Sequence, residues 1–350
     1  MNKYISNFPH GIMFHHFHDE THPPSGQGSI SAKEFEEILN FIGTENIIGP
    51  DEWITKLRKN KLKENDMCIT FDDALKSQYD ICVPILEKYD LKCFWFVYSS
   101  VFEGILTKLE IYSNFRTKYF EKIDDFYELF FSKYENSDFE KIDKNRLQSF
   151  VHKKQSIYSF YSFNDIKFRF MRDEILVKNE YEKLMDEIIQ EKGIKIVDIG
   201  KNLWLTNSHL KILSENGHEI GLHSYDHPTV LSKLSYEEQY EQYKKNYMHI
   251  KQVCNKDILS MAHPSNSYSD DTLKILRRLN IVCGFRSNRT PPEGKKINPS
   301  SLEIGREDHT NILQKIRTWL QTIILFCHAF HIFQSHQLIV KPFRFFPYRS

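Results

Sequence analysis

The sequence predicts an α/β protein built around a mostly parallel β-sheet. Short apolar runs rich in β-branched and aromatic residues recur along its 350 residues. Amphipathic helical patterns lie between many of these runs, and strands that alternate with helices are typical of βα units. Some runs lead directly into Asp or His, and the carboxyl ends of parallel strands are where such folds carry their reactive groups. The length suits one α/β barrel, alone or with an insertion.

Seven apolar runs stand out as the candidate strands. They cover residues 11–17, 67–71, 92–99, 219–224, 258–263, 282–287 and 301–305. Two of the helices between them have clear start signals. Residues 31–42 repeat apolar side chains at helical spacing behind Ser31 as the N-cap, and a similar pattern follows Ser269.

The middle of the chain breaks this alternation. From residue 105 to residue 192 there is neither Gly nor Pro, and charged residues alternate with Phe, Tyr, Ile and Leu. This pattern predicts several helices inserted into the barrel. Two interpretations stay open at this point: a lid over the site, or helices that only pack outside the barrel.

Composition excludes some classes of protein. The formal net charge is zero, whereas a nucleic-acid-binding protein needs a basic face, so nucleic acid is not an expected partner. The six cysteines lie in apolar settings without CxxC spacing and are expected to be reduced core residues. The N-terminus lacks the pattern of a signal peptide, and no window reaches the ~20 apolar residues of a membrane span. We expect a cytoplasmic protein.

The C-terminal segment differs from the rest of the chain. After Asp308 there is no acidic residue, while an apolar stretch and a basic, aromatic end follow. Such a tail is compatible with peripheral contact to an anionic membrane at the inner face. A helix docked on the barrel and a tail without function are the alternatives.

Two adjacent carboxylates, Asp72 and Asp73, end the apolar run 67–71. Helix capping would explain them without any chemistry, since Asp is favoured at an N-cap. Alternatively, both turn toward one cavity, where a cation or a shared proton offsets their repulsion. The sequence around them does not decide between the two.

A pair of histidines favours the second explanation. His223 and His227 are four residues apart at the end of another predicted strand, a spacing that can point both imidazoles the same way. Two His and one Asp would form a site for a divalent metal with open positions, and the second Asp would accept a proton from the bound water. Spacing alone does not assign which Asp has which role.

The segments "TFDD" (70–73) and "HSYDH" (223–227) resemble the first two motifs of the polysaccharide deacetylases, the NodB-homology carbohydrate esterases. The resemblance implies a distorted (β/α)7 barrel with a helical insertion. It implies that Asp72 is the general base, and that Asp73, His223 and His227 hold a divalent metal, with Zn²⁺ the expected ion.

The third motif of that family departs from the pattern, because His263 stands near the place of the usual Arg. The poly-N-acetylglucosamine deacetylase-like branch resembles this chain in other segments. Its early strand matches "GIMFHHF", which maps the catalytic acid onto His15, and its late segment matches "LEIGRED", which makes Arg306 the candidate partner of Asp72. His309 and His328 are weaker candidates for the acid. We interpret His16 and its neighbouring histidines as part of an exposed polar loop.

The predicted function is metal-dependent removal of the N-acetyl group from an amino sugar, with an intracellular nucleotide- or lipid-linked sugar of surface polysaccharide biosynthesis as the expected substrate. The backbone N–H of Tyr225 or Ser265 is the candidate oxyanion donor. A metal-dependent hydrolase of cyclic imides or ureides and a non-catalytic carbohydrate-binding barrel are the alternatives. The predicted organisation has four parts: 1–104 and 193–313 as the two parts of the barrel, 105–192 as the helical insertion, and 314–350 as the tail.

Overall fold

The computed structural model describes residues 4–137, 141–155, 161–319 and 321. In these residues seven parallel strands form one sheet in the order β6-β5-β4-β3-β2-β1-β7. The strands are β1 (His10–Phe14), β2 (Met67–Asp72), β3 (Phe94–Val97), β4 (Glu219–Leu222), β5 (Ser260–Ala262), β6 (Cys283–Phe285) and β7 (Arg306–Asp308).

The two edges of the sheet meet and nearly close a barrel. Phe285 of β6 forms a parallel bridge with Ile304, which lies two residues before β7. Backbone hydrogen bonds support this contact, from Ile304 N to Gly284 O at 2.8 Å and from Arg286 N to Ile304 O at 2.7 Å. The predicted distorted (β/α)7 barrel is therefore confirmed. Among the described residues, none of the helices combines the length and hydropathy that crossing a membrane requires.

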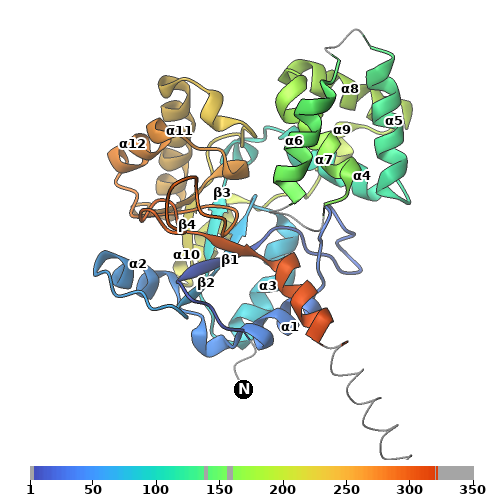
Figure 1. Ribbon diagram of the computed structural model, residues 1–350. Helices are drawn as coiled ribbons and strands as arrows, with labels where there is room; N and C mark the ends of the chain where they lie inside the picture. Colours follow the sequence, from blue (N-terminus) through green and yellow to red (C-terminus); the bar gives the residue numbers. More distant parts are fainter. Residues whose placement is uncertain (1–3, 138–140, 156–160, 320, 322–350) are drawn as a thin grey trace, which may run out of the picture.

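Helices cover the outside of the barrel (Figure 1). They are α1 (Ala32–Ile42), α2 (Pro50–Arg58), α3 (Lys76–Lys88), α10 (Asn207–Glu215), α11 (Tyr236–Cys254) and α12 (Asp270–Arg278). The predicted caps are confirmed: Ser31 and Ser269 each accept a hydrogen bond from the first turn of their helix.

Alternation along each strand separates two cores. One set of strand residues packs with the outer helices, as Ile69 and Trp95 do. The other set, which includes Cys68, Phe94 and Phe285, forms a second buried cluster that fills the barrel. Thr70 and Asp72 follow Cys68 at steps of two, so their side chains face this interior.

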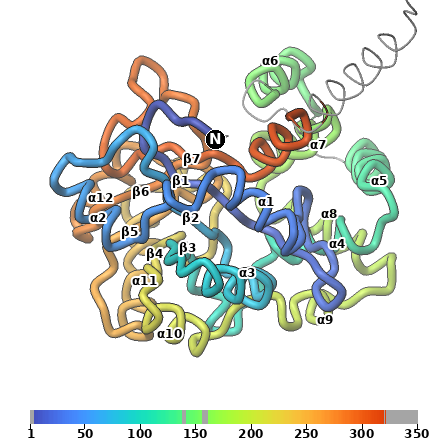
Figure 2. The backbone as a smooth tube through the Cα atoms, turned by 90° about the horizontal axis from the view of Figure 1, so that it is seen from below, coloured from blue at the N-terminus to red at the C-terminus, as the bar shows by residue number. Residues whose placement is uncertain are grey.

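A helical lobe interrupts the barrel between β3 and β4, as Figures 1 and 2 both show. It consists of α4 (Lys108–Lys118), α5 (Ile123–Glu135), α6 (Lys144–Gln155), α7 (Phe163–Phe170), the π-helical turn η3 (Met171–Ile175), α8 (Lys178–Glu191) and α9 (Ile196–Gly200). The lobe has an aromatic core of its own, which Leu75, Tyr98 and Trp204 of the barrel join. Trp204 donates its indole N–H to the Tyr98 hydroxyl at 2.6 Å. Most of the predicted C-terminal tail, residues 320 and 322–350, lies outside the described residues.

Candidate active site

The turn after β2 aims two adjacent carboxylates at one cavity. Asp72 is the last residue of β2 and faces the barrel interior, while Asp73 and Ala74 adopt left-handed backbone conformations with φ of 76° and 56°. This conformation is uncommon for residues other than Gly and reverses the normal alternation. As a result both carboxylates line a cavity of about 310 Å³ at the carboxyl ends of the strands.

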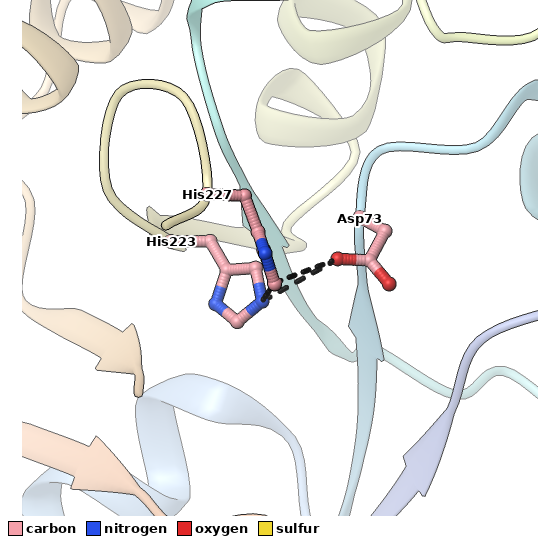
Figure 3. A group of neighbouring side chains, drawn as sticks. All are labelled: Asp73, His223 and His227. Atoms are coloured by element: carbon pink, nitrogen blue, oxygen red, sulfur yellow. Dashed lines mark hydrogen bonds and ion pairs between the residues drawn. The ribbon is translucent and has the colours of Figure 1, made fainter. Parts of the chain in front are cut away.

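Asp73, His223 and His227 converge in that cavity (Figure 3). His223 directly follows β4, and the loop after it returns His227 to the same place through positive φ values at Ser224 and His227. Asp73 Oδ1 lies 3.5 Å from His223 Nε2 and 3.4 Å from His227 Nε2, and the two Nε2 atoms are 3.1 Å apart. All three side chains are buried.

The hydrogen bonds around this triad fix His223 but leave a buried oxygen of Asp73 without a partner. His223 Nδ1 lies 2.9 Å from the carbonyl oxygen of Ala262, which can only accept, so Nδ1 carries a proton and Nε2 faces Asp73 and His227. Asp73 Oδ1 has no hydrogen-bond partner in the described structure, and neither has His227 Nδ1. Burial lowers the pKa of His227 to about 4, so its imidazole is neutral at pH 7. One carboxylate oxygen and two imidazole nitrogens at these separations fit a divalent metal ion.

Asp72 is held by a buried arginine. Arg306 of β7 donates from Nη1 to Asp72 Oδ1 and from Nη2 to Asp72 Oδ2, both at 2.7 Å. Arg306 Nη1 also reaches Thr70 Oγ1 at 3.1 Å, and Nε donates to the carbonyl oxygen of Arg286 at 2.7 Å. Burial alone would raise the pKa of Asp72, but the Arg306 guanidinium and then His223 hold it below its usual value. Asp72 is therefore an ionised carboxylate in a fixed orientation.

A glycine on β1 makes room for that arginine. A Cβ atom built at Gly11 would lie 3.0 Å from Arg306 Cγ and 3.3 Å from a ring carbon of Phe285. Gly11 is paired with Arg306 in the sheet. A side chain at this position would therefore push against the stem of the guanidinium that holds Asp72.

His15 lies on the open side of the same carboxylates. It follows β1, and its Nε2 atom is 3.7 Å from Asp72 Oδ2 and 3.9 Å from Asp73 Oδ2. Its side chain is 27% exposed and is the most accessible of the six predicted site residues. The structure thus brings together all six predicted residues: Asp72, Asp73, His15, His223, His227 and Arg306.

The interpretation of His16 as an exposed loop residue is wrong. Its side chain is only 12% exposed and lines the cavity, with Nε2 3.7 Å from Glu110 Oε2 of the helical lobe. Burial lowers the pKa of His16 to about 3. The sequence pattern could not show this, because Glu110 comes from a distant helix. His309, a weaker candidate for the acid, is buried with its ring nitrogens 3.1 Å from Met13 O and 2.8 Å from Gly28 O, and His328 lies outside the described residues.

His263 occupies a structural position. Its Nε2 atom lies 2.8 Å from Leu302 O, its ring stacks on Tyr268 at 4.2 Å, and burial lowers its pKa to about 4. Of the two candidate oxyanion donors, the N–H of Tyr225 donates to Gln242 Oε1 at 3.0 Å, so it is already used. Ser265 lines the cavity.

Gln78 is a site residue that the sequence reasoning missed. Its fully buried amide donates to Asp72 O at 2.5 Å and His15 O at 2.7 Å, and so ties the ends of β1 and β2 together. The sequence does carry a signal for it. Gln78 is a polar residue on the apolar face of α3, three and four positions before Ile81 and Cys82.

Comparison with known proteins gives a family for part of the chain. Residues 176–284 match the family model described as polysaccharide deacetylase, which confirms the resemblance that the two motifs predict. The matched segment contains His223 and His227, whereas Asp72 and Asp73 precede the helical lobe that divides the barrel. An uncharacterised protein of Bacillus subtilis strain 168, YlxY, is 33% identical over 99 residues, which are 28% of this chain and 31% of that protein.

The chain is similar to solved structures of low sequence identity. The Streptococcus pyogenes deacetylase PplD, solved in complex with acetate, has a TM-score of 0.51 at 19% identity, with 89% of this chain and 99% of that chain covered. IcaB from Ammonifex degensii has a TM-score of 0.49 at 13% identity, with 86% and 91% covered. The likeness to PplD extends the fold assignment to most of the chain.

Proposed function

From the polysaccharide deacetylase segment at 176–284, we propose that this chain is a metal-dependent deacetylase that hydrolyses the N-acetyl group of an amino sugar. The observation that carries the proposal is that an oriented carboxylate and a candidate metal site lie side by side in one cavity. Asp72, oriented by Arg306, lies beside the triad of Asp73, His223 and His227, with His223 Nε2 4.0 Å from Asp72 Oδ2. A base next to a candidate metal site is what amide hydrolysis by activated water requires.

In this scheme Asp73, His223 and His227 hold the ion, and we infer zinc from two imidazoles and one carboxylate. When bound, such an ion polarises the acetyl carbonyl and lowers the pKa of a water molecule. Asp72 accepts the proton of the attacking water, whose oxygen bonds to the acyl carbon. Arg306 keeps Asp72 ionised and fixes both carboxylate oxygens, with Oδ2 on the side of the proposed metal ligands, 4.0 Å from His223 Nε2.

His15 has the role of general acid. When the C–N bond breaks, the departing amine needs a proton, and the His15 imidazolium supplies it from the open side of the cavity. Its Nε2 atom lies within 4 Å of both Asp72 and Asp73, so the acid and the base flank one point. Acetate and the free amino sugar are the products.

For the finer substrate we propose an intracellular N-acetyl sugar linked to a nucleotide or a lipid, used in surface polysaccharide biosynthesis at the inner face of the membrane. The thiol state supports a reducing compartment, because the five described cysteines are all free and four of them are buried. The predicted membrane contact of the tail after Asp308 belongs to the same proposal.

The experiment that tests the function is acetate release from a panel of N-acetylated sugars: free sugars, nucleotide sugars and short oligosaccharides. The purified protein is assayed as prepared, after chelation, and after zinc is restored. We expect release that chelation stops and zinc restores. Asp72→Asn should abolish turnover with its metal content retained, while His223→Ala should lose both. Full activity in either variant would refute the assignment of these residues.

The same panel separates the alternatives. Hydrolysis of a small cyclic imide without acetate release from any sugar would favour the imide or ureide hydrolase. Sugar binding without turnover or metal would favour the non-catalytic barrel. The absence of an Arg near His263 does not favour that barrel, because Arg306 of another strand holds Asp72.

A further inference from the structure

One wall of the catalytic cavity is basic and comes from the helical lobe. Four cationic residues of α4, α6, α7 and η3 line the same cavity as Asp72 and Asp73: Arg116, Lys154, Arg169 and Arg172. The mechanism above uses none of them. A cavity built only for a neutral acetamido sugar has no need for a wall of this charge.

Arg116 is the most informative member because it is buried and has no carboxylate partner. Its side chain is 9% exposed, and its guanidinium carbon lies 4.6 Å from the ring centroid of Phe168. Within the described chain its one hydrogen bond runs from Nε to Tyr112 O at 3.2 Å, which leaves the two Nη atoms for the cavity. A buried guanidinium keeps its charge at any physiological pH, so it requires an anionic or strongly polar partner.

Arg169 is a half-buried cation of the wall that also lacks a carboxylate partner among the described residues. Its guanidinium carbon lies 4.2 Å from the ring centroid of Tyr161, and it forms no ion pair with a carboxylate of the described residues. Stacking on an aromatic ring fixes the plane of the guanidinium but leaves its N–H groups free to donate. Arg116 and Arg169 thus present two oriented forks to one space.

The carboxylates of the same wall are already engaged. Asp173 forms a two-point ion pair with Arg172, at 2.7 Å and 2.8 Å, and Glu174 lies 3.4 Å from Lys233. Burial and then the charge of Asp73 raise the pKa of Glu110 well above its usual value, while Arg116 acts to lower it. The wall therefore keeps an excess of positive charge. Lys154 is also close to these charges: burial lowers its pKa, Asp173 raises it, and Arg169 and Arg172 lower it further.

The basic wall is close to the reacting groups. Glu110 on α4 lies 3.7 Å from His16, and the charges of both Asp73 and Arg116 act on it. Arg116 is six residues further along α4, about 9 Å at 1.5 Å per residue. A ligand of the size of a sugar with one attached group can therefore reach from the metal site to this wall.

We propose that the wall of Arg116, Lys154 and Arg169 binds a phosphate group attached to the sugar, so that the substrate is a phosphate or diphosphate ester of an N-acylated amino sugar. The inference rests on the proposed deacetylase function and names the substrate class of the same site. Planar guanidinium forks match phosphate oxygens in pairs, and a doubly charged group offsets the charges of both Arg116 and Arg169. The helical lobe is then the part of the molecule that selects the substrate.

The test compares four N-acetylhexosamine substrates that differ in one substituent: a neutral methyl glycoside, a sugar 1-phosphate, a nucleotide diphosphate ester and a polyprenyl phosphate ester. A hexuronate-linked glycoside adds a carboxylate control. We expect kcat/KM at least tenfold higher for the phosphate esters than for the neutral and carboxylate glycosides. The best ester then identifies a nucleotide or a lipid as the carrier. Equal values for neutral and phosphorylated substrates would overturn the inference while the deacetylase function stands.

Variants locate the effect in the wall. Arg169→Gln, at a half-buried position, should reduce the preference for phosphate at least tenfold, chiefly through KM. Arg116→Lys keeps the charge but not the fork and should reduce it less. Lys183→Gln removes a cation from an exposed position of α8 and is the matched control, expected to keep the preference. An unchanged preference in Arg169→Gln would refute the assignment.

A binding measurement separates this inference from the proposed function. Uridine diphosphate is titrated into the full chain and into Arg169→Gln by calorimetry, without any turnover. Binding that weakens at least tenfold in the variant supports the phosphate wall even if no sugar is deacetylated. Binding of equal strength in both proteins contradicts the wall even if deacetylation is observed.

Discussion

Asp72 and Arg306, 234 positions apart in the chain, form a two-point ion pair inside the barrel, with both N···O distances at 2.7 Å. The side chains are 3% and 0% exposed. The pair joins β2 to β7 across β1, with Thr70 and the carbonyl oxygen of Arg286 completing the donors of the guanidinium. Leaving either member without the other would bury an uncompensated charge, which costs about 3–5 kcal/mol.

The ion pair predicts a shift in the pH–rate profile. Asp72 must be ionised to accept a proton, and Arg306 lowers the pKa that burial would otherwise raise. In Arg306→Gln the pKa of Asp72 should therefore rise, and the acid limb of kcat/KM should move to higher pH. Arg306→Lys keeps the charge but loses the second bond, so it should show a smaller shift and about a tenfold loss of kcat at its optimum. An acid limb that stays in place in Arg306→Gln would show that Asp72 is not the titrating base.

Gly11 gives a prediction for a residue that touches no substrate. Gly11→Ala should lower kcat more than it lowers stability, because the new Cβ presses on the Arg306 stem at 3.0 Å and turns the guanidinium from Asp72. Gly49→Ala is the matched control, since its Cβ would meet only Lys92 at 3.5 Å. Activity and thermal midpoint are measured for both variants. Equal kinetics in Gly11→Ala and the wild type would mean that β1 or Arg306 relaxes without consequence.

Metal binding should appear as a gain in stability. An ion that binds the folded protein and not the unfolded chain adds about 2.7 kcal/mol when its free concentration is 100 times Kd. Zinc should therefore raise the thermal midpoint of the wild type by several degrees and leave His227→Ala unchanged. His18→Ala is the control, because His18 contacts Ser29 in a loop and should keep the shift. A zinc shift of full size in His227→Ala would place the ion elsewhere.

Those parts of the fold that depend on local pattern could be predicted from the sequence. Parallel strands that are buried on both faces appear in the sequence as apolar runs, and β2 is buried at every position. The sequence therefore predicts where β2 and β4 end, and with them the Asp and His residues at those ends. The last strand was misplaced. The apolar run 301–305 contributes only the bridge at Ile304, and β7 is the charged segment Arg306–Asp308.

Partners distant in sequence explain why charged residues form a strand there. Arg306 is paired with Asp72, and Glu307 Oε2 accepts from Arg289 Nη1 at 2.8 Å, so burial of these charges is compensated. No periodicity along 306–308 carries that information. The same limit applies to His16 and to the basic wall, whose position depends on how the helical lobe meets the barrel. Arg306 itself could be named only through a family resemblance.

The last prediction concerns Glu219 and the dependence of stability on pH. Glu219 of β4 is half-buried. Leu259 N–H at 3.3 Å and the Ser260 hydroxyl at 3.1 Å stabilise its charged form, but the loss of solvent around the carboxyl raises its pKa to about 7. Between the ordinary pKa of 4.5 and 7 the folded protein holds a proton that the unfolded chain has released. The free energy of unfolding should therefore fall as pH rises through this window, by on the order of 1–3 kcal/mol, and level off above it.

Glu219→Gln isolates this contribution, because Gln keeps the shape and an acceptor oxygen but does not titrate. Urea unfolding at pH 5, 6, 7 and 8 gives the free energy of unfolding for both proteins. Other groups titrate in this pH range in both proteins. The quantity to compare is therefore the difference in free energy of unfolding between the variant and the wild type at each pH. We expect the variant to gain stability relative to the wild type from pH 5 to pH 8. A constant difference would mean that Glu219 is already ionised in the folded protein at pH 5, with its two hydrogen bonds outweighing burial.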